Sequence, residues 1–308
     1  VFSVWLRTTM LTRNAFCLAV SLTLSTVALQ GCSGSTGSNS KDGQFFSVHQ
    51  HIFPSEYLQS LQDYNVTFVP GFDPAKQAPF DLDNTLAHMN KRNIRSSILS
   101  LSFPGLFFPQ LGEKAGDYAV YLAYESNNDL FNVVNQPKAR CRFGGFVALP
   151  LPLVAESITE TRRGLDSLHL DGVVLNSNYG GMYLGDRRLD PLYEELDIRS
   201  AVVLIHPVGP VTTPQPDVPG WMLDFVFDTT RTIVSMLVNG TFTRYPHIRF
   251  IVSHGGGTVP FLEDRIEELQ YDETIRQYGD PKKILRQLYY DTTNIEMGST
   301  ALAAVAGG

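Results

Sequence analysis

The chain has 308 residues, of which 43% are hydrophobic and 18% charged, so it can bury a large core and is not a disordered polymer. Its formal net charge is -7, and its 24 Lys and Arg residues are scattered along the chain. A nucleic-acid-binding protein would present a basic stripe to the phosphates, and the sequence contains none. This balance favours an enzyme that acts on a small molecule and has no nucleic-acid partner.

Residues 1–31 have the features of a leader sequence. Met10 and Arg13 are typical of a true start with a positive region, and residues 15–29 form an apolar stretch too short for a comfortable membrane span. Leu29 and Gly31 precede Cys32 as in a bacterial lipoprotein signal, which predicts export and a lipid anchor on Cys32, facing the periplasm, as the only membrane attachment. The alternatives are ordinary secretion, or a cytoplasmic enzyme with a misassigned start.

Residues 32–44 are rich in Ser and Gly and are predicted to be a flexible linker. From residue 45 onward, strand and helix signals alternate. The predicted strands are, in chain order, residues 45–51, 94–101, 143–149, 171–175, 201–205, 248–253 and 288–290. The predicted helices are residues 83–91, 155–168, 191–196, 222–238, 260–270, 281–287 and 300–306.

This alternation indicates one domain, residues 45–308, with a parallel sheet and right-handed crossovers. The fold class that fits is α/β, a TIM (β/α)8 barrel of the metal-dependent hydrolase type. Only seven strand signals are present, so we expect the barrel to be incomplete and to stop before strand 8.

Four of the seven histidines lie where predicted strands end. His49 and His51 are two residues apart and therefore point to the same face of a strand, and His206 and His254 follow two later strands. Each feature alone is weak, because a His-x-His pair arises by chance on many surface strands. Together they favour a shared metal site, because catalytic groups collect at the strand ends of such barrels. The other three histidines are expected to be ordinary surface or packing residues: His88, His169 and His247.

At these residues the chain resembles the amidohydrolase superfamily. The resemblance is to the branch typified by aminocarboxymuconate-semialdehyde decarboxylase and the 6-methylsalicylate decarboxylase-like enzymes, and it covers residue 47 to the end. The matching segments are VHQHIFP at residues 48–54, DTTR at residues 228–231, YPHIRFIVSHGGG at residues 245–257 and YDT at residues 290–292.

The resemblance implies that His49, His51 and His206 bind a divalent ion, with Zn²⁺ expected and Mn²⁺ as the alternative. It also implies that His254 is the catalytic residue, which activates metal-bound water or transfers protons, with a pKa that we expect to be near neutral. The family completes its metal site with an eighth-strand aspartate in a Gly-Ser/Thr-Asp motif, which this sequence does not contain. Asp291 belongs to the seventh strand and is not expected to replace it.

The first functional hypothesis is a metal-dependent, non-oxidative decarboxylase of an aromatic or unsaturated carboxylic acid. The alternative is a hydrolase of the same fold that opens a lactone, ester or amide, and a further alternative is a non-catalytic binding lipoprotein. Aromatic residues in segments 100–108 and 220–221 are either a surface for a flat substrate or ordinary packing. The family often forms dimers, so a homodimer is also expected.

Overall fold

The computed structural model describes residues 6–7, 45–66, 73–101, 103–210 and 217–293. Its main sheet has the order β1-β2-β3-β4-β5-β8-β9-β10, and β1 pairs antiparallel with β2 whereas all the others run parallel. The strands of this sheet are β1 (Leu6–Arg7), β2 (Phe45–Ile52), β3 (Ile94–Leu101), β4 (Phe143–Ala148), β5 (Gly172–Asn176), β8 (Val202–His206), β9 (Arg249–Val252) and β10 (Tyr289–Tyr290). A small hairpin is formed by β6 (Asn178–Tyr179) and β7 (Met182–Tyr183).

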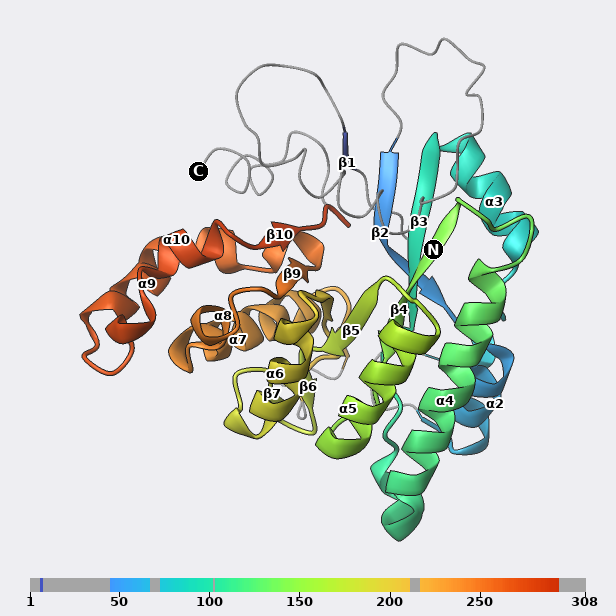
Figure 1. The fold of residues 1–308 in the computed structure, drawn as a ribbon, viewed down its shortest axis with the longest axis horizontal. Coiled ribbons are helices and arrows are strands. Elements are labelled where there is room, and N and C mark those ends of the chain that lie inside the picture. The colour runs from blue at the N-terminus through green and yellow to red at the C-terminus, as the bar shows by residue number, and fades with distance from the viewer. Residues whose placement is uncertain (1–5, 8–44, 67–72, 102, 211–216, 294–308) are drawn as a thin grey trace.

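All seven predicted strands form, in the predicted parallel order. Figure 1 shows that the sheet curls, with helices on its outer side. The curl brings the ends of the first and last parallel strands close together. As a result, Nδ1 of His49 on β2 lies 2.6 Å from Oδ2 of Asp291, which directly follows β10. The predicted α/β barrel fold is confirmed. An eighth parallel strand is not among the residues described here, and the predicted helix 300–306 lies outside them.

The helices between the strands cover the sheet (Figure 1). They are α2 (Ser55–Asp63), α3 (Leu82–Lys91), α4 (Ala115–Val134), α5 (Val154–Arg162), α6 (Asp190–Ile198), α7 (Asp224–Val238), α8 (Thr241–Arg244), α9 (Glu263–Glu267) and α10 (Pro281–Leu285). The prediction of one helix over residues 260–270 is wrong in part, since α9 is short and is flanked by the 3₁₀ turns Val259–Phe261 and Glu268–Tyr271. No helix in the described part of the chain combines the length and apolar character needed to cross a membrane.

Strands β5 and β8 are buried along their whole length, which explains the apolar runs at residues 173–175 and 202–205. One cluster fills the inside of the curled sheet and takes Ile98 from β3, Phe146 from β4 and Leu204 from β8. A second cluster, which includes Val147 and Val203, packs between the sheet and the helices. Burial of these side chains on both sides fixes the register of the strands and therefore the positions of the residues at their ends.

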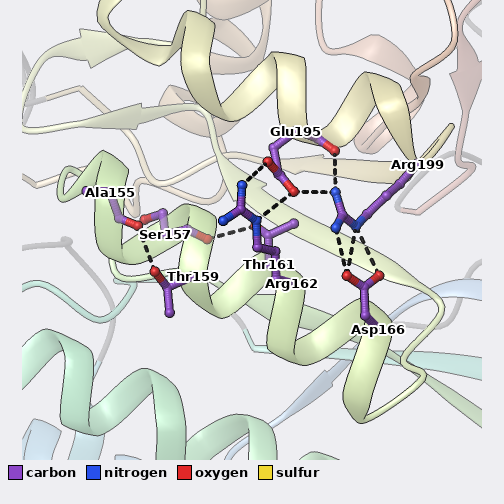
Figure 2. A network of polar contacts seen from close by, with 8 residues as sticks. All are labelled: Ala155, Ser157, Thr159, Thr161, Arg162, Asp166, Glu195 and Arg199. Carbon is purple, nitrogen blue, oxygen red and sulfur yellow. Dashed lines mark hydrogen bonds and ion pairs between the residues drawn. The ribbon is translucent and has the colours of Figure 1, made fainter.

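Outside the sheet, α5 and α6 are tied together by ion pairs (Figure 2). Arg162 makes a bidentate contact with Glu195, with nitrogen–oxygen distances of 2.9 and 2.7 Å. Arg199 contacts the same carboxylate and also Asp166, at 2.7 Å. Planar guanidinium groups paired in this way add orientation as well as energy, so this network holds two neighbouring crossover helices in a fixed relation.

Candidate metal centre

Three histidines from two strands converge at the carboxyl ends of the parallel strands. His49 and His51 lie on β2, and His206 is the last residue of β8. One ring nitrogen from each of the three lies within 4.8 Å of the other two. The ring centroids are 4.8 to 5.0 Å apart, and the rings meet edge to face. The structure therefore brings together the three residues that the sequence analysis proposed as metal ligands.

The backbone explains this arrangement. The register of β2 against β3 shifts between Ser47 and Gln50, which indicates a β-bulge beside His49. Beyond it, His51 is paired with Ser100 and Gln50 with Leu99. On β8, alternate residues face the interior of the curled sheet, so His206 continues the row that begins with Val202 and Leu204 in the inner cluster.

Burial decides the charge of these imidazoles. Desolvation, followed by the nearby histidines, holds the pKa of His51 and of His206 well below the usual value of 6.5. Both rings are therefore neutral at pH 7 and keep a lone pair for a metal ion. Neutral imidazole nitrogen is the donor that zinc and similar divalent ions bind in proteins.

The donor geometry fits a divalent ion. Nε2 of His49 lies 3.1 Å from Nε2 of His51, and two lone pairs at this distance repel unless a proton or a cation lies between them. Nitrogen ligands at about 2.0–2.1 Å from one zinc ion would be roughly 3.3 Å apart in tetrahedral geometry, which is close to this separation.

His254 is the fourth imidazole of the cluster. Its ring centroid lies 5.2 Å from that of His49 and 5.9 Å from that of His206. Burial, assisted by His49 and opposed by Asp291, lowers its pKa to about 4. This pKa is lower than the near-neutral value expected from the sequence, because the ring is desolvated by burial. In this environment His254 is a neutral base at pH 7.

The glycines after His254 allow the chain to turn sharply. His254 itself has a φ of 53°, and the next three residues, all glycines, also have positive φ values. Residues other than glycine rarely adopt positive φ. A Cβ at Gly257 would lie 2.2 Å from the carbonyl oxygen of Val226 on α7. The glycine run is thus a tight turn packed against α7, and it fixes the direction in which His254 leaves β9.

Two phenylalanines lie beside the histidine cluster. The ring of Phe103 is nearly parallel to that of His206, with centroids 6.5 Å apart, and Phe225 meets Phe103 edge to face at 5.0 Å. Of the aromatic segments noted in the sequence, Phe103 borders the site, whereas Phe108 is buried in the core and Trp221 is half exposed. The core position of Phe108 is ordinary packing, whereas Phe103 lies where it could contact a ligand of the histidine cluster.

Two carboxylates near the histidines were not assigned a role from the sequence. Asp291 places Oδ2 2.6 Å from Nδ1 of His49. Burial acts to raise the pKa of Asp291, but its electrostatic interaction and hydrogen bond with His49 outweigh burial and hold the pKa below 3.8. The position of Asp291 at the end of a barrel strand was the available signal, since functional groups collect there.

The second carboxylate, Asp228 on α7, is fully buried and braces the loop after His206. It accepts hydrogen bonds from Tyr183 and Asn178, at 2.7 and 2.8 Å, and from the hydroxyl of Ser177. The oxygen of Ser177 in turn accepts from the main-chain N–H of Val208, two residues after His206. The histidines set aside as ordinary lie elsewhere; His247, for example, is exposed and pairs with Asp197 at 2.8 Å.

Comparison with known proteins identifies the family. Residues 47–277 match the family model described as amidohydrolase, so the chain belongs to the amidohydrolase family. It is 33% identical over 260 residues to the decarboxylase yanB of Aspergillus niger, which covers 79% of this chain and 67% of the relative. It is 31% identical over 278 residues to the 6-methylsalicylic acid decarboxylase acuB of Aspergillus aculeatus, which covers 84% and 78%.

The branch expected from the sequence is confirmed by a third relative. The 2-amino-3-carboxymuconate-6-semialdehyde decarboxylase of Dictyostelium discoideum is 35% identical over 193 residues, 61% of this chain and 51% of the relative. Among solved structures, the 5-carboxyvanillate decarboxylase of Novosphingobium aromaticivorans, crystallised with manganese, has a TM-score of 0.66 at 20% identity. That alignment covers 79% of this chain and 76% of the other, and it shows the shared fold.

Proposed function

We propose that this protein is a metal-dependent, non-oxidative decarboxylase of an aromatic or unsaturated carboxylic acid. His49, His51 and His206 would hold the divalent ion, and His254 would transfer the proton. The observation that carries this proposal is the convergence of four imidazoles, two of them fully buried, at the carboxyl ends of the strands. The relatives described above, which are named decarboxylases, support the reaction class.

A divalent ion, when bound, supplies a Lewis acid for the oxygens of the substrate. The three histidine donors suit zinc, which we take as the resident ion, and manganese in the solved 5-carboxyvanillate decarboxylase supports the alternative. Both ions bind imidazole nitrogen, so the ligand set alone does not distinguish them. Metal analysis of the purified protein decides between zinc and manganese.

The chain's own residues supply the remaining steps. The parallel rings of Phe103 and His206, with Phe225 at their edge, offer an apolar wall to one face of a flat substrate. A carboxylate bound beside His254 raises the pKa of this ring, because the negative charge favours the imidazolium. The protonated ring then gives its proton to the substrate carbon, which keeps the electron pair of the broken C–C bond as carbon dioxide leaves.

The direct test is the release of carbon dioxide by the full-length purified protein from 6-methylsalicylate and other hydroxybenzoates. Carbon dioxide and the decarboxylated phenol in equal amounts are expected, and the His254→Ala variant should release neither at a comparable rate. The same preparation is assayed with lactone, ester and amide substrates. Hydrolysis of one of these without decarboxylation of any acid would replace the proposal by the hydrolase alternative.

We also propose export as a lipoprotein anchored through Cys32, a residue outside the described part of the chain. The support is the leader composition, with Leu29 and Gly31 ahead of Cys32. Metabolic labelling with a fatty acid should mark the wild-type protein and leave a Cys32→Ser variant unlabelled. Equal labelling of the two would contradict the anchor.

A further inference from the structure

Asp291 is a buried carboxylate whose main chain is held on both sides. Its N–H donates to the carbonyl oxygen of Val252 at 3.0 Å, and its own carbonyl oxygen accepts from the N–H of Gly255 at 3.0 Å. These bonds extend the parallel pairing of β9 and β10 by one residue. The side chain therefore leaves a rigid backbone, and only 1% of the residue is exposed.

The two carboxylate oxygens have different partners. Oδ2 lies 2.6 Å from Nδ1 of His49, whereas Oδ1 accepts from the main-chain N–H groups of His254 and Thr293, at 2.8 and 3.0 Å. Two main-chain N–H groups that donate to a carboxylate favour its ionised form, and an ionised carboxylate can only accept. The proton in the short contact with His49 therefore belongs to Nδ1.

This contact determines whether Nε2, the other ring nitrogen of His49, carries a proton. With the proton on Nδ1, Nε2 of His49 carries a lone pair, and Nε2 is the atom that faces Nε2 of His51 at 3.1 Å. In the other tautomer, Nε2 would carry a proton and could not bind a metal ion. A carboxylate behind a ligating imidazole is a common way to set its tautomer and raise its basicity.

The other oxygen acts on the backbone of the proton-transfer residue. His254 has a φ of 53°, a left-handed conformation that is unfavourable for a residue with a Cβ. The hydrogen bond from its N–H to Oδ1 helps to hold this conformation, and the ring stays beside the ligands, 5.2 Å from that of His49. One side chain thus connects a ligand on β2 with the turn that follows β9.

We propose that Asp291 is a positioning residue that holds His49 in the Nδ1–H tautomer for metal binding and, with the same carboxylate, fixes the main chain of His254. This inference deepens the proposed function and rests on it for the identity of the reaction. It does not make Asp291 a metal ligand, since the group of donor atoms within 4.8 Å of one another, among the described residues, contains the three histidines and no carboxylate.

The test uses Asp291→Asn, which keeps the size of the side chain and an oxygen for the two main-chain N–H groups. The amide presents a donor to Nδ1 of His49 and so favours the Nε2–H tautomer. In the metal-free protein with ¹⁵N-labelled histidine, NMR should show His49 as Nδ1–H in the wild type and as Nε2–H in the variant. The His49 signal is assigned as the one that a His49→Gln variant lacks.

The metal affinity is measured in parallel by competition between the protein and a chelator for Zn²⁺. Asp291→Asn should bind Zn²⁺ about 10–100-fold more weakly than the wild type, the usual effect of removing such a partner. The matched control is Asp171→Asn, which removes a partly buried carboxylate that accepts the N–H of Gly145 at 2.8 Å, far along the strands from the histidines. The control should bind Zn²⁺ like the wild type.

An Nε2–H tautomer of His49 in the wild type overturns the proposal. This measurement is made on the wild-type protein and so does not depend on the folding of any variant. Unchanged Zn²⁺ affinity in a folded Asp291→Asn protein overturns it as well. If the wild type binds Zn²⁺ but decarboxylates nothing while Asp291→Asn binds weakly, the proposed reaction fails and the positioning role stands. If the wild type decarboxylates, and Asp291→Asn has the same His49 tautomer and the same Zn²⁺ affinity as the wild type, the positioning role alone fails.

Discussion

Replacing His206 with alanine removes one of the three nitrogen donors of the candidate metal centre. In structural zinc sites, four ligands share an apparent binding free energy of about 10–16 kcal/mol, so one ligand contributes about 2.5–4 kcal/mol. The expected loss of affinity is therefore about 10²–10³-fold. His206 is only 2% exposed and lies between the other ligands and Phe103, so no solvent-facing group of the described chain can take its place easily.

This loss can be read as a thermal shift. Free metal at about 1,000 times Kd stabilises the wild type by about 4.1 kcal/mol, which raises Tm by about 8–16 °C in a domain of this size. At the same metal concentration, His206→Ala would be stabilised by only about 0.4–1.4 kcal/mol, or about 1–5 °C. Elemental analysis after gel filtration should show about one ion per wild-type chain and little in the variant.

The matched control is His247→Ala, because His247 is exposed and pairs with Asp197 away from the cluster. It should keep the metal content and the thermal shift of the wild type. A His206→Ala protein that retains one ion per chain and a full thermal shift would refute the assignment of this ligand.

Three further predictions concern His254, Asp228 and Asp171. His254→Ala should keep most of the metal and lose turnover by about 10²–10⁴-fold, the usual contribution of a proton-transfer group, and unchanged kcat would remove it from the mechanism. Asp228→Ala should lower the free energy of unfolding by about 3–5 kcal/mol in urea, because three donors, two of them buried, lose their acceptor; a change under about 1 kcal/mol would contradict the bracing role. Burial raises the pKa of Asp171 to about 6 from 3.8, so the folded state binds this proton more tightly than the unfolded chain. That contribution is complete below about pH 4 and is lost as pH rises through about 6, so Asp171→Asn should gain stability relative to the wild type over this range; a pH-independent difference would show that the shift is absent.

The strands and the convergence of the histidines at their ends could be predicted because the signals are local. Val202 to Ile205 form a continuous apolar run of a strand buried on both faces, and His206 directly follows it. The end of α7 was equally readable, since Asn239 and Gly240 follow Val238 and Gly240 adopts a φ of 67°. Once parallel strands are assigned, the residues at their carboxyl ends must meet at one edge of the sheet.

The helix α4 was missed although it spans 20 residues. Its buried positions recur every three or four residues, but several are Ala, Ser or Asn, so the hydrophobic period is faint in the sequence. Asn127 illustrates the reason, because it is buried to bind the main chain of Ala148 and the carboxylate of Glu160. A polar side chain with such partners has no apolar signature.

The contact between Asp291 and His49 could not be predicted either, since it joins residues 242 positions apart in the sequence. It depends on how tightly the sheet curls and on the β-bulge beside His49. Both are consequences of packing throughout the domain. The lowered pKa of His254 has the same origin, because burial of the ring depends on all the strands that surround it.

The central claim is that the histidine cluster binds a divalent ion on which decarboxylation depends. The most direct measurement removes the metal from the full-length protein with a chelator and then follows carbon dioxide release from a ¹³C-carboxyl-labelled hydroxybenzoate that the native protein decarboxylates. The account predicts no release from the metal-free protein and recovery on addition of about one equivalent of Zn²⁺ or Mn²⁺. Full release from protein shown by elemental analysis to be free of metal would contradict it.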